Sequence, residues 1–63
     1  MNDSSLQILE YFRYEHLPEK LQSISRPFGL MAQEIALLPD NRERLKALDH
    51  LLAAKDAAVR AAL

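Results

Sequence analysis

The chain has no cysteine, no tryptophan and a single glycine among its 63 residues. The lack of cysteine excludes disulfides and thiolate metal sites, and it fits a reducing cytoplasm. The two histidines, His16 and His50, lie too far apart for a local zinc motif. A chain of this length has room for one thin core, which supplies about 3–5 kcal/mol. With disulfides excluded and no local zinc motif, we expect oligomerisation to add the missing stability.

An excess of charge of one sign is also missing, since eight basic and nine acidic residues leave a net charge of −1. Sequence-independent binding of DNA or RNA needs a basic face, so the balance argues against a nucleic-acid polymer as partner. It does not argue against a small anion, because two or three phosphates need only a few local cations. No apolar run approaches the roughly 20 residues of a membrane span, and no signal-peptide pattern opens the chain. We therefore expect a soluble, intracellular protein with no membrane partner.

Catalytic motifs are absent from the sequence as well. There is no cysteine nucleophile, no glycine-rich phosphate loop and no pair of histidine ligands, and the serines have no evident base at fixed spacing. His50 follows Asp49 directly and would therefore point to a different face of a helix. We expect neither enzyme activity nor a cofactor or metal.

The apolar periodicity predicts an all-α fold, an antiparallel helical hairpin with a short N-terminal helix. Ser4 and Gln7 have the spacing of a capping box, which predicts a first helix from Leu6 to about Arg13. A second helix starts at Pro18, because proline suits the first helical position. Its large apolar side chains recur at intervals of three and four, the spacing of a helix packed against another. This predicted seam consists of Leu21, Ile24, Phe28, Met31, Ile35 and Leu38.

The turn that follows is predicted from its capping pattern. Asp40 as N-cap, with Glu43 three residues later, starts a third helix that runs from about Asn41 to Ala62. Two helices joined by a short turn form an antiparallel hairpin. Within the second helix, Pro27 removes a backbone donor, which predicts a kink over residues 23–27.

The third helix carries two apolar stripes. We expect the first to face the rest of its own chain, and the second, rich in alanine, to let the backbone of another subunit approach. A single wide stripe on a buried helix is the alternative. The whole chain, 1–63, is thus predicted to be one domain that assembles as a homo-oligomer. The first stripe is Leu45, Leu48, Leu52, Val59 and Ala62, and the second is Ala47, Leu51, Ala54, Ala58 and Ala61.

Lys55 occupies a position of the first stripe where an apolar residue is expected. Lysine is almost never fully buried without a partner. It either extends its amine to solvent or meets an anion, such as a phosphate, at a subunit boundary. Arg60 lies five residues later, roughly 140° around the helix. The two cations would therefore share a site only across a symmetric interface.

Three of the four aromatic residues lie between Tyr11 and Pro18. Phe12 and Tyr14 either cover the hairpin as hydrophobic lids, or Tyr14 offers its ring to a nucleobase, worth about 1–3 kcal/mol per stacked base. His16 would stack or donate beside it. The expected kink is either purely structural or tilts Arg26, which matters if that residue faces a ligand.

Four motifs follow one another along the chain: Phe12-x-Tyr14-x-His16-x-Pro18, Leu38-Pro39 with Glu43, Ala47-Leu48-x-x-Leu51 and Ala57-Ala58-Val59. In this order, and with an amphipathic helix between the first two, they resemble a family of small phage-borne helical hairpins. That family contains the anti-CBASS cyclic-oligonucleotide sponges and the related hairpin part of Thoeris-blocking sponges. The resemblance covers the chain from about Phe12 to its C-terminus.

The resemblance implies a homohexamer that binds signalling cyclic di- or trinucleotides between protomers, in the cytoplasm of an infected bacterium, without cleaving them. It assigns base stacking to Tyr14 and phosphate binding to Arg26, with His16 nearby. Arg60 lies one position from the terminal arginine of the family. With Phe12 and Lys55 these residues form the predicted ligand site. A rival interpretation is a structural or adaptor oligomer that binds a protein through its alanine-rich face.

Overall fold

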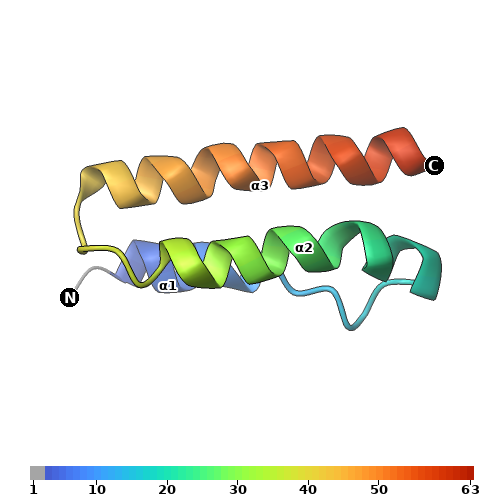
Figure 1. The fold of residues 1–63 in the computed structure, drawn as a ribbon, viewed down its shortest axis with the longest axis horizontal. Coiled ribbons are helices and arrows are strands. Elements are labelled where there is room, and N and C mark those ends of the chain that lie inside the picture. The colour runs from blue at the N-terminus through green and yellow to red at the C-terminus, as the bar shows by residue number, and fades with distance from the viewer. Residues whose placement is uncertain (1–2) are drawn as a thin grey trace.

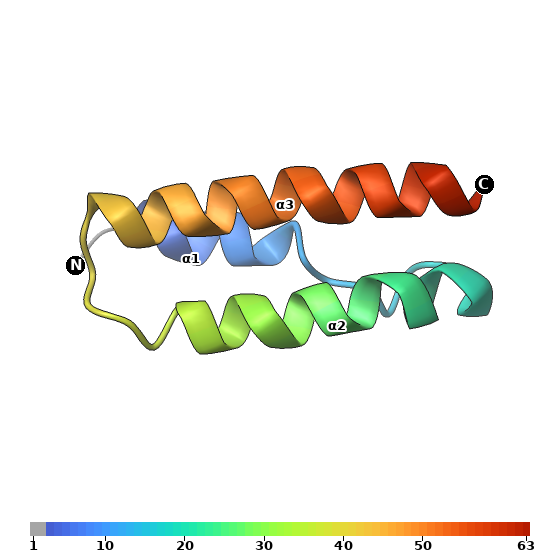
Figure 2. The same ribbon diagram turned by 45° about the horizontal axis from the view of Figure 1, so that its top comes forward.

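The computed structural model describes the backbone of residues 3–63 and the side chains of residues 7–63. These residues form three helices and no strand, α1 (Asp3–Glu10), α2 (Glu19–Ile35) and α3 (Arg42–Ala62), which confirms the predicted all-α class. α2 and α3 lie side by side and run in opposite directions (Figure 1). α1 lies along the first half of α3 (Figure 2).

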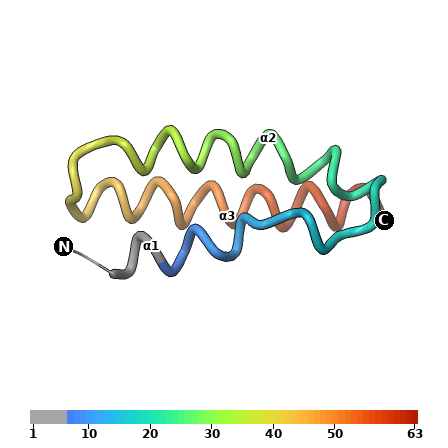
Figure 3. The backbone as a smooth tube through the Cα atoms, turned by 90° about the horizontal axis from the view of Figure 1, so that it is seen from below, coloured from blue at the N-terminus to red at the C-terminus, as the bar shows by residue number. Residues whose placement is uncertain are grey.

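The three helices form an elongated bundle that measures 35 × 18 × 15 Å. Seen from below, α3 runs between α1 and α2 (Figure 3), and it makes contacts with both. The segment that joins α1 to α2 crosses toward the end of the bundle where α3 finishes (Figure 3). The aromatic segment approaches α2 at Gly29, on the helix that carries the predicted cation Arg26.

α1 begins and ends three residues before the predicted positions. Ser4, the predicted N-cap, lies inside the helix, and its side chain lies outside the part that the structure describes. Beyond Glu10 the backbone N–H groups of residues 11–13 donate to carbonyls three residues back, at 3.1, 3.1 and 3.3 Å. Such short-range bonds tighten the end of a helix. They turn the aromatic segment away from the axis of α1.

α2 is one continuous helix, with Pro27 inside it. Pro18 is its N-cap, with φ −54° and ψ 148°, so the helix starts one residue later than predicted. The helix ends at Ile35. It does not reach Leu38, because Pro39 disfavours helical backbone geometry at the residue before it.

The most deeply buried line of α2 is made of small residues, and the predicted seam of large apolar residues is wrong in this respect. Met31 and Leu38, both in that seam, are 48% and 53% exposed. The carbonyl oxygen of Phe12 lies only 3.2 Å from the position that a Cβ on Gly29 would take. Because the segment after α1 approaches α2 so closely, the buried face of α2 is rotated toward its small side chains. The buried residues of α2 are Ser25, Gly29 and Ala32.

α3 turns its first apolar stripe inward, as predicted, with Leu48 fully buried at its centre. The core joins Leu48 to Ile8, Phe12 and Ala32. Two alanines of the second stripe, Ala54 and Ala61, are exposed. Further apolar residues pack around this small core: Leu9, Phe28, Ile35, Leu45, Leu51 and Leu52.

The turn between α2 and α3 is held by Arg44, a residue to which the sequence pattern assigns no role. Its Nη1 donates to the carbonyls of Ala36 and Leu38, at 3.0 Å each. Its Nη2 lies 2.7 Å from Asp40 Oδ1, and the arginine side chain is only 10% exposed. The predicted N-cap Asp40 is wrong, because its carboxylate pairs with Arg44. Asn41 caps α3 instead, with Oδ1 accepting from the Arg44 N–H at 3.0 Å and the extended backbone typical of an N-cap.

We expect Arg44→Ala to lower the free energy of unfolding by about 1.5–3 kcal/mol, because charged hydrogen bonds to the end of α2 are lost. Arg42→Ala is the matched control, since Arg42 is exposed and forms no ion pair with any residue that the structure describes. Its effect should stay within about 0.5 kcal/mol. Urea denaturation followed by circular dichroism measures both. An equal loss in the two variants would contradict this role of Arg44.

Candidate functional site

The ring of Tyr14 packs against α2 at Gly29. The ring atoms Cδ1 and Cε1 of Tyr14 lie 3.5 Å from the position that a Cβ on Gly29 would take. The backbone of Gly29 has no positive φ, so the glycine is needed here for close approach and not for an unusual conformation. Tyr14 itself is half-buried. One part of its ring is therefore fixed on α2, and the rest is open to a ligand.

A surface cavity of about 280 Å³ brings Tyr14 together with Arg26. Arg26 is exposed and forms no ion pair with any residue that the structure describes. The predicted aromatic ring and the predicted cation thus share the wall of one hollow. Its remaining lining residues are Glu19, Gln22 and Ser23.

Gln22 holds the segment after Tyr14 against the first turn of α2. Its Nε2 donates to the carbonyl of Leu17 at 2.7 Å and to that of Glu15 at 3.2 Å. His16 lies between these two residues, is exposed, and lines neither of the two cavities beside Tyr14. The structure therefore keeps His16 near the predicted site in sequence but does not direct it into the cavity.

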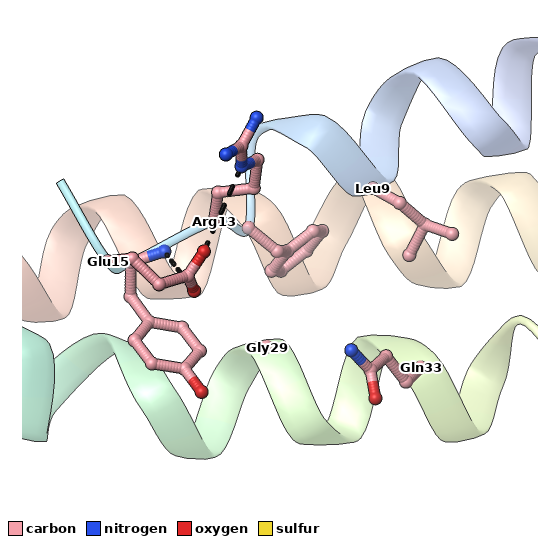
Figure 4. A pocket seen from close by; sticks show the side chains of 7 residues that line it. Leu9, Arg13, Glu15, Gly29 and Gln33 are labelled. Carbon is pink, nitrogen blue, oxygen red and sulfur yellow. Dashed lines mark hydrogen bonds and ion pairs between the residues drawn. The ribbon is translucent and has the colours of Figure 1, made fainter.

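A second cavity, of about 180 Å³, lies beside Tyr14 toward α1. Glu15 reaches over it, accepting from the Tyr14 N–H at 3.5 Å and lying 3.9 Å from Arg13 Nε (Figure 4). Glu15 and Gln33 lie on opposite sides of Gly29, and the amide of Gln33 is directed toward the space between them (Figure 4). The lining residues are Leu9, Phe12, Arg13, Tyr14, Glu15, Gly29 and Gln33.

Phe12 is a core residue. Its side chain is 3% exposed and packs with the buried cluster of α1, α2 and α3. It contributes part of the wall of the second cavity but has no free face for a ligand to stack on. Phe12 therefore acts as a hydrophobic packing residue of the hairpin.

Lys55 and Arg60 lie apart from Tyr14. The side chain of Lys55 is 12% exposed, and its Nζ lies 3.0 Å from Oδ1 of the neighbouring Asp56. Arg60 is exposed in the last turn of α3. Neither residue lines the cavities beside Tyr14. The structure brings together Tyr14 and Arg26, and it does not bring the other predicted cations to them.

The sequence analysis missed the polar residues around this pair, although their spacing contains a signal. Gln22, Arg26, Gly29 and Gln33 follow one another at intervals of four, three and four residues. Residues at such intervals lie on one face of a helix. A polar stripe interrupted by a single glycine indicates a surface on which another group sits. The apolar periodicity of the same helix predicts contacts on a different face.

Comparisons with protein-family models, with curated proteins and with solved structures found no match to this chain. The described residues contain no group of three or more histidine, aspartate or glutamate side chains that could hold a metal ion. Across the same part of the chain, no helix has the length and apolar character needed to cross a membrane. The function therefore has to be argued from the cavities themselves.

We expect Tyr14→Ala to destabilise the empty protein by about half of the roughly 3–5 kcal/mol lost with a fully buried aromatic residue, because Tyr14 is half-buried. Tyr14→Phe should stay within about 0.5 kcal/mol, since the hydroxyl makes no hydrogen bond within the described part of the chain. Thermal unfolding of the two variants beside the wild type measures both effects. A full loss in Tyr14→Ala would assign the ring to the core.

Proposed function

We propose that this protein is a phage-type anti-defence sponge. It binds and sequesters cyclic di- or trinucleotide immune signals, without cleaving them, in pockets between the protomers of a homo-oligomer. The observation that carries the proposal is the shared cavity of Tyr14 and Arg26. An aromatic ring and a guanidinium group are the two groups that recognise a base and a phosphate. They are also the pair that the resemblance to the sponge family implies.

The charge of Arg26 supports a phosphate ligand in this cavity. Arg13 lies 3.5 Å from Glu10 and 3.9 Å from Glu15, and Lys55 is paired with Asp56. Arg26 has no such carboxylate partner among the described residues, so its guanidinium is available for bidentate hydrogen bonds to a phosphate. Glu19 also lines this cavity, and its carboxylate disfavours a polyanion. Binding of this kind requires no activated nucleophile, and the signal would be withheld from its effector intact.

Exposed apolar residues next to Arg26 support the oligomer. Leu30 and Met31 are 49% and 48% exposed on α2. Met31 also lines an apolar groove of about 200 Å³ together with Pro27, Phe28 and Leu51. A second protomer seated on this groove would bury this apolar surface of α2 and α3. We propose a homohexamer, as in the family that the chain resembles, located in the cytoplasm of the infected host.

The same exposed groove favours a second candidate function, an oligomeric adaptor that binds a protein partner and no nucleotide. An adaptor needs the apolar surface of Met31 and Leu51, but it has no use for an unpaired arginine beside an aromatic ring. Nucleotide binding therefore separates the two functions.

We expect calorimetry against a panel of cyclic di- and trinucleotides to find a tight ligand, and heating of the complex to release that ligand unmodified. Arg26→Ala should weaken its binding by about ten- to hundredfold, because a charge-assisted contact of about 1.5–3 kcal/mol is lost. Lys20→Ala is the control, since this exposed cation of α2 does not line the cavity. No binding across the whole panel would leave the adaptor as the better function.

We expect Ala58→Glu to lower the mass of the assembly, because it places a charge on the alanine-rich stripe of α3. Ala53→Glu adds the same charge on an exposed residue outside both stripes and should leave the mass unchanged. Light scattering at micromolar concentration measures the mass, with circular dichroism to verify the helical content. A monomeric wild type at that concentration would refute the oligomer.

A further inference from the structure

A polar stripe runs along α2 on both sides of Tyr14. Its members are Gln22, Arg26 and Gln33, with Gly29 as the gap over which the Tyr14 ring is seated. The ring is shared by both cavities. Arg26 lines the larger one and Gln33 lines the smaller one. Both hollows therefore belong to one surface of α2, divided by one aromatic side chain.

We infer that the two cavities form a single nucleotide site, in which the smaller cavity binds an adenine base through Gln33 while the phosphate meets Arg26. The inference rests on the proposed function for the phosphate end and adds the identity of the base. Arg26 and Gln33 are seven residues apart in one helix, about 10 Å along its axis. This length matches the reach of a nucleotide from its phosphate to the far edge of its base.

The Gln33 amide supplies the chemistry that reads adenine. A glutamine side chain carries both donors and an acceptor, and it pairs bidentately with the N6 amino group and N7 of adenine. Gln33 is exposed, and its amide forms no hydrogen bond with any residue that the structure describes. The group is therefore free to meet a base, and it is directed toward the space beside Gly29 (Figure 4).

Glu15 closes the other end of the smaller cavity. Its carboxylate lines the same cavity from the side opposite Gln33 (Figure 4). The pair with Arg13 is long, 3.9 Å, and both side chains are more than 60% exposed, 65% and 63%. Such an exposed pair is weak and can rearrange when a base enters.

The remaining walls of the smaller cavity suit a flat ring. Leu9 and Phe12 supply apolar surface, and Gly29 contributes backbone without a side chain. A phosphate would be disfavoured here, because Arg13, the cation at this end, lies between Glu10 and Glu15. The base and the phosphate of one ligand thus have distinct places on either side of Tyr14.

The test uses adenosine 5′-monophosphate and guanosine 5′-monophosphate as probes of the wild-type protein, by two-dimensional NMR with nitrogen labelling. We expect the adenine nucleotide to shift the side-chain amide resonances of Gln33 and to bind about fivefold or more tightly than the guanine nucleotide. Gln33→Ala should abolish this preference and keep the weaker, phosphate-driven binding. Arg26→Ala should weaken both nucleotides alike. Glu34→Ala is the control, because this exposed neighbour lines neither cavity.

Equal affinity for the two nucleotides, tighter binding of the guanine nucleotide, or an unmoved Gln33 amide would overturn the base assignment. A panel of cyclic dinucleotides separates this outcome from failure of the sponge. Tight binding that Arg26→Ala reduces and Gln33→Ala leaves unchanged would refute the adenine pocket and support the sponge. An adenine preference through Gln33, with no cyclic nucleotide retained, would support the pocket and refute the sponge.

Discussion

The close approach of the aromatic segment to α2 at Gly29 is the contact on which the rest of the structure depends. The Phe12 carbonyl and the Tyr14 ring both lie where a side chain at position 29 would extend. This approach lets Phe12 enter the core beside Ala32 and Leu48. It also fixes Tyr14 on the outside of the same helix. The contact at one small residue thus positions both a core side chain and the ring that lines the two cavities.

The same contact explains why a chain with many large apolar residues has so small a core. Close packing against Ser25, Gly29 and Ala32 buries little apolar area and turns larger side chains such as Met31 outward. A core of this size supplies only a few kcal/mol. Surface contacts, such as the hydrogen bonds of Arg44 to the turn, therefore contribute a larger share of the stability than they would in a larger domain. The exposed apolar side chains then become available for contacts between subunits, and this connects the fold to the proposed assembly.

The candidate site follows from placing one aromatic ring across a polar helix face. On its own, the stripe of Gln22, Arg26 and Gln33 is an ordinary solvated surface. With Tyr14 seated over Gly29, it becomes two hollows of different chemistry, one with an unpaired guanidinium and one with an unpaired amide opposite a carboxylate. A ligand that carries both a phosphate and a base matches this division. Neither hollow needs a backbone of unusual geometry, because ordinary helical spacing supplies the polar groups.

The sequence by itself determined the helical class, the approximate extents of α2 and α3 and the inward stripe of α3, because helical periodicity and capping preferences act over a few residues. It gave the wrong buried face for α2, the wrong N-cap for α3 and no role for Arg44 or Gln33. Those features depend on contacts between segments far apart in the chain. Only the tertiary structure decided that Phe12 belongs to the core and that Lys55 and Arg60 lie apart from Tyr14. Periodicity shows which residues share a face, but which face is buried is fixed by the segment that packs against it.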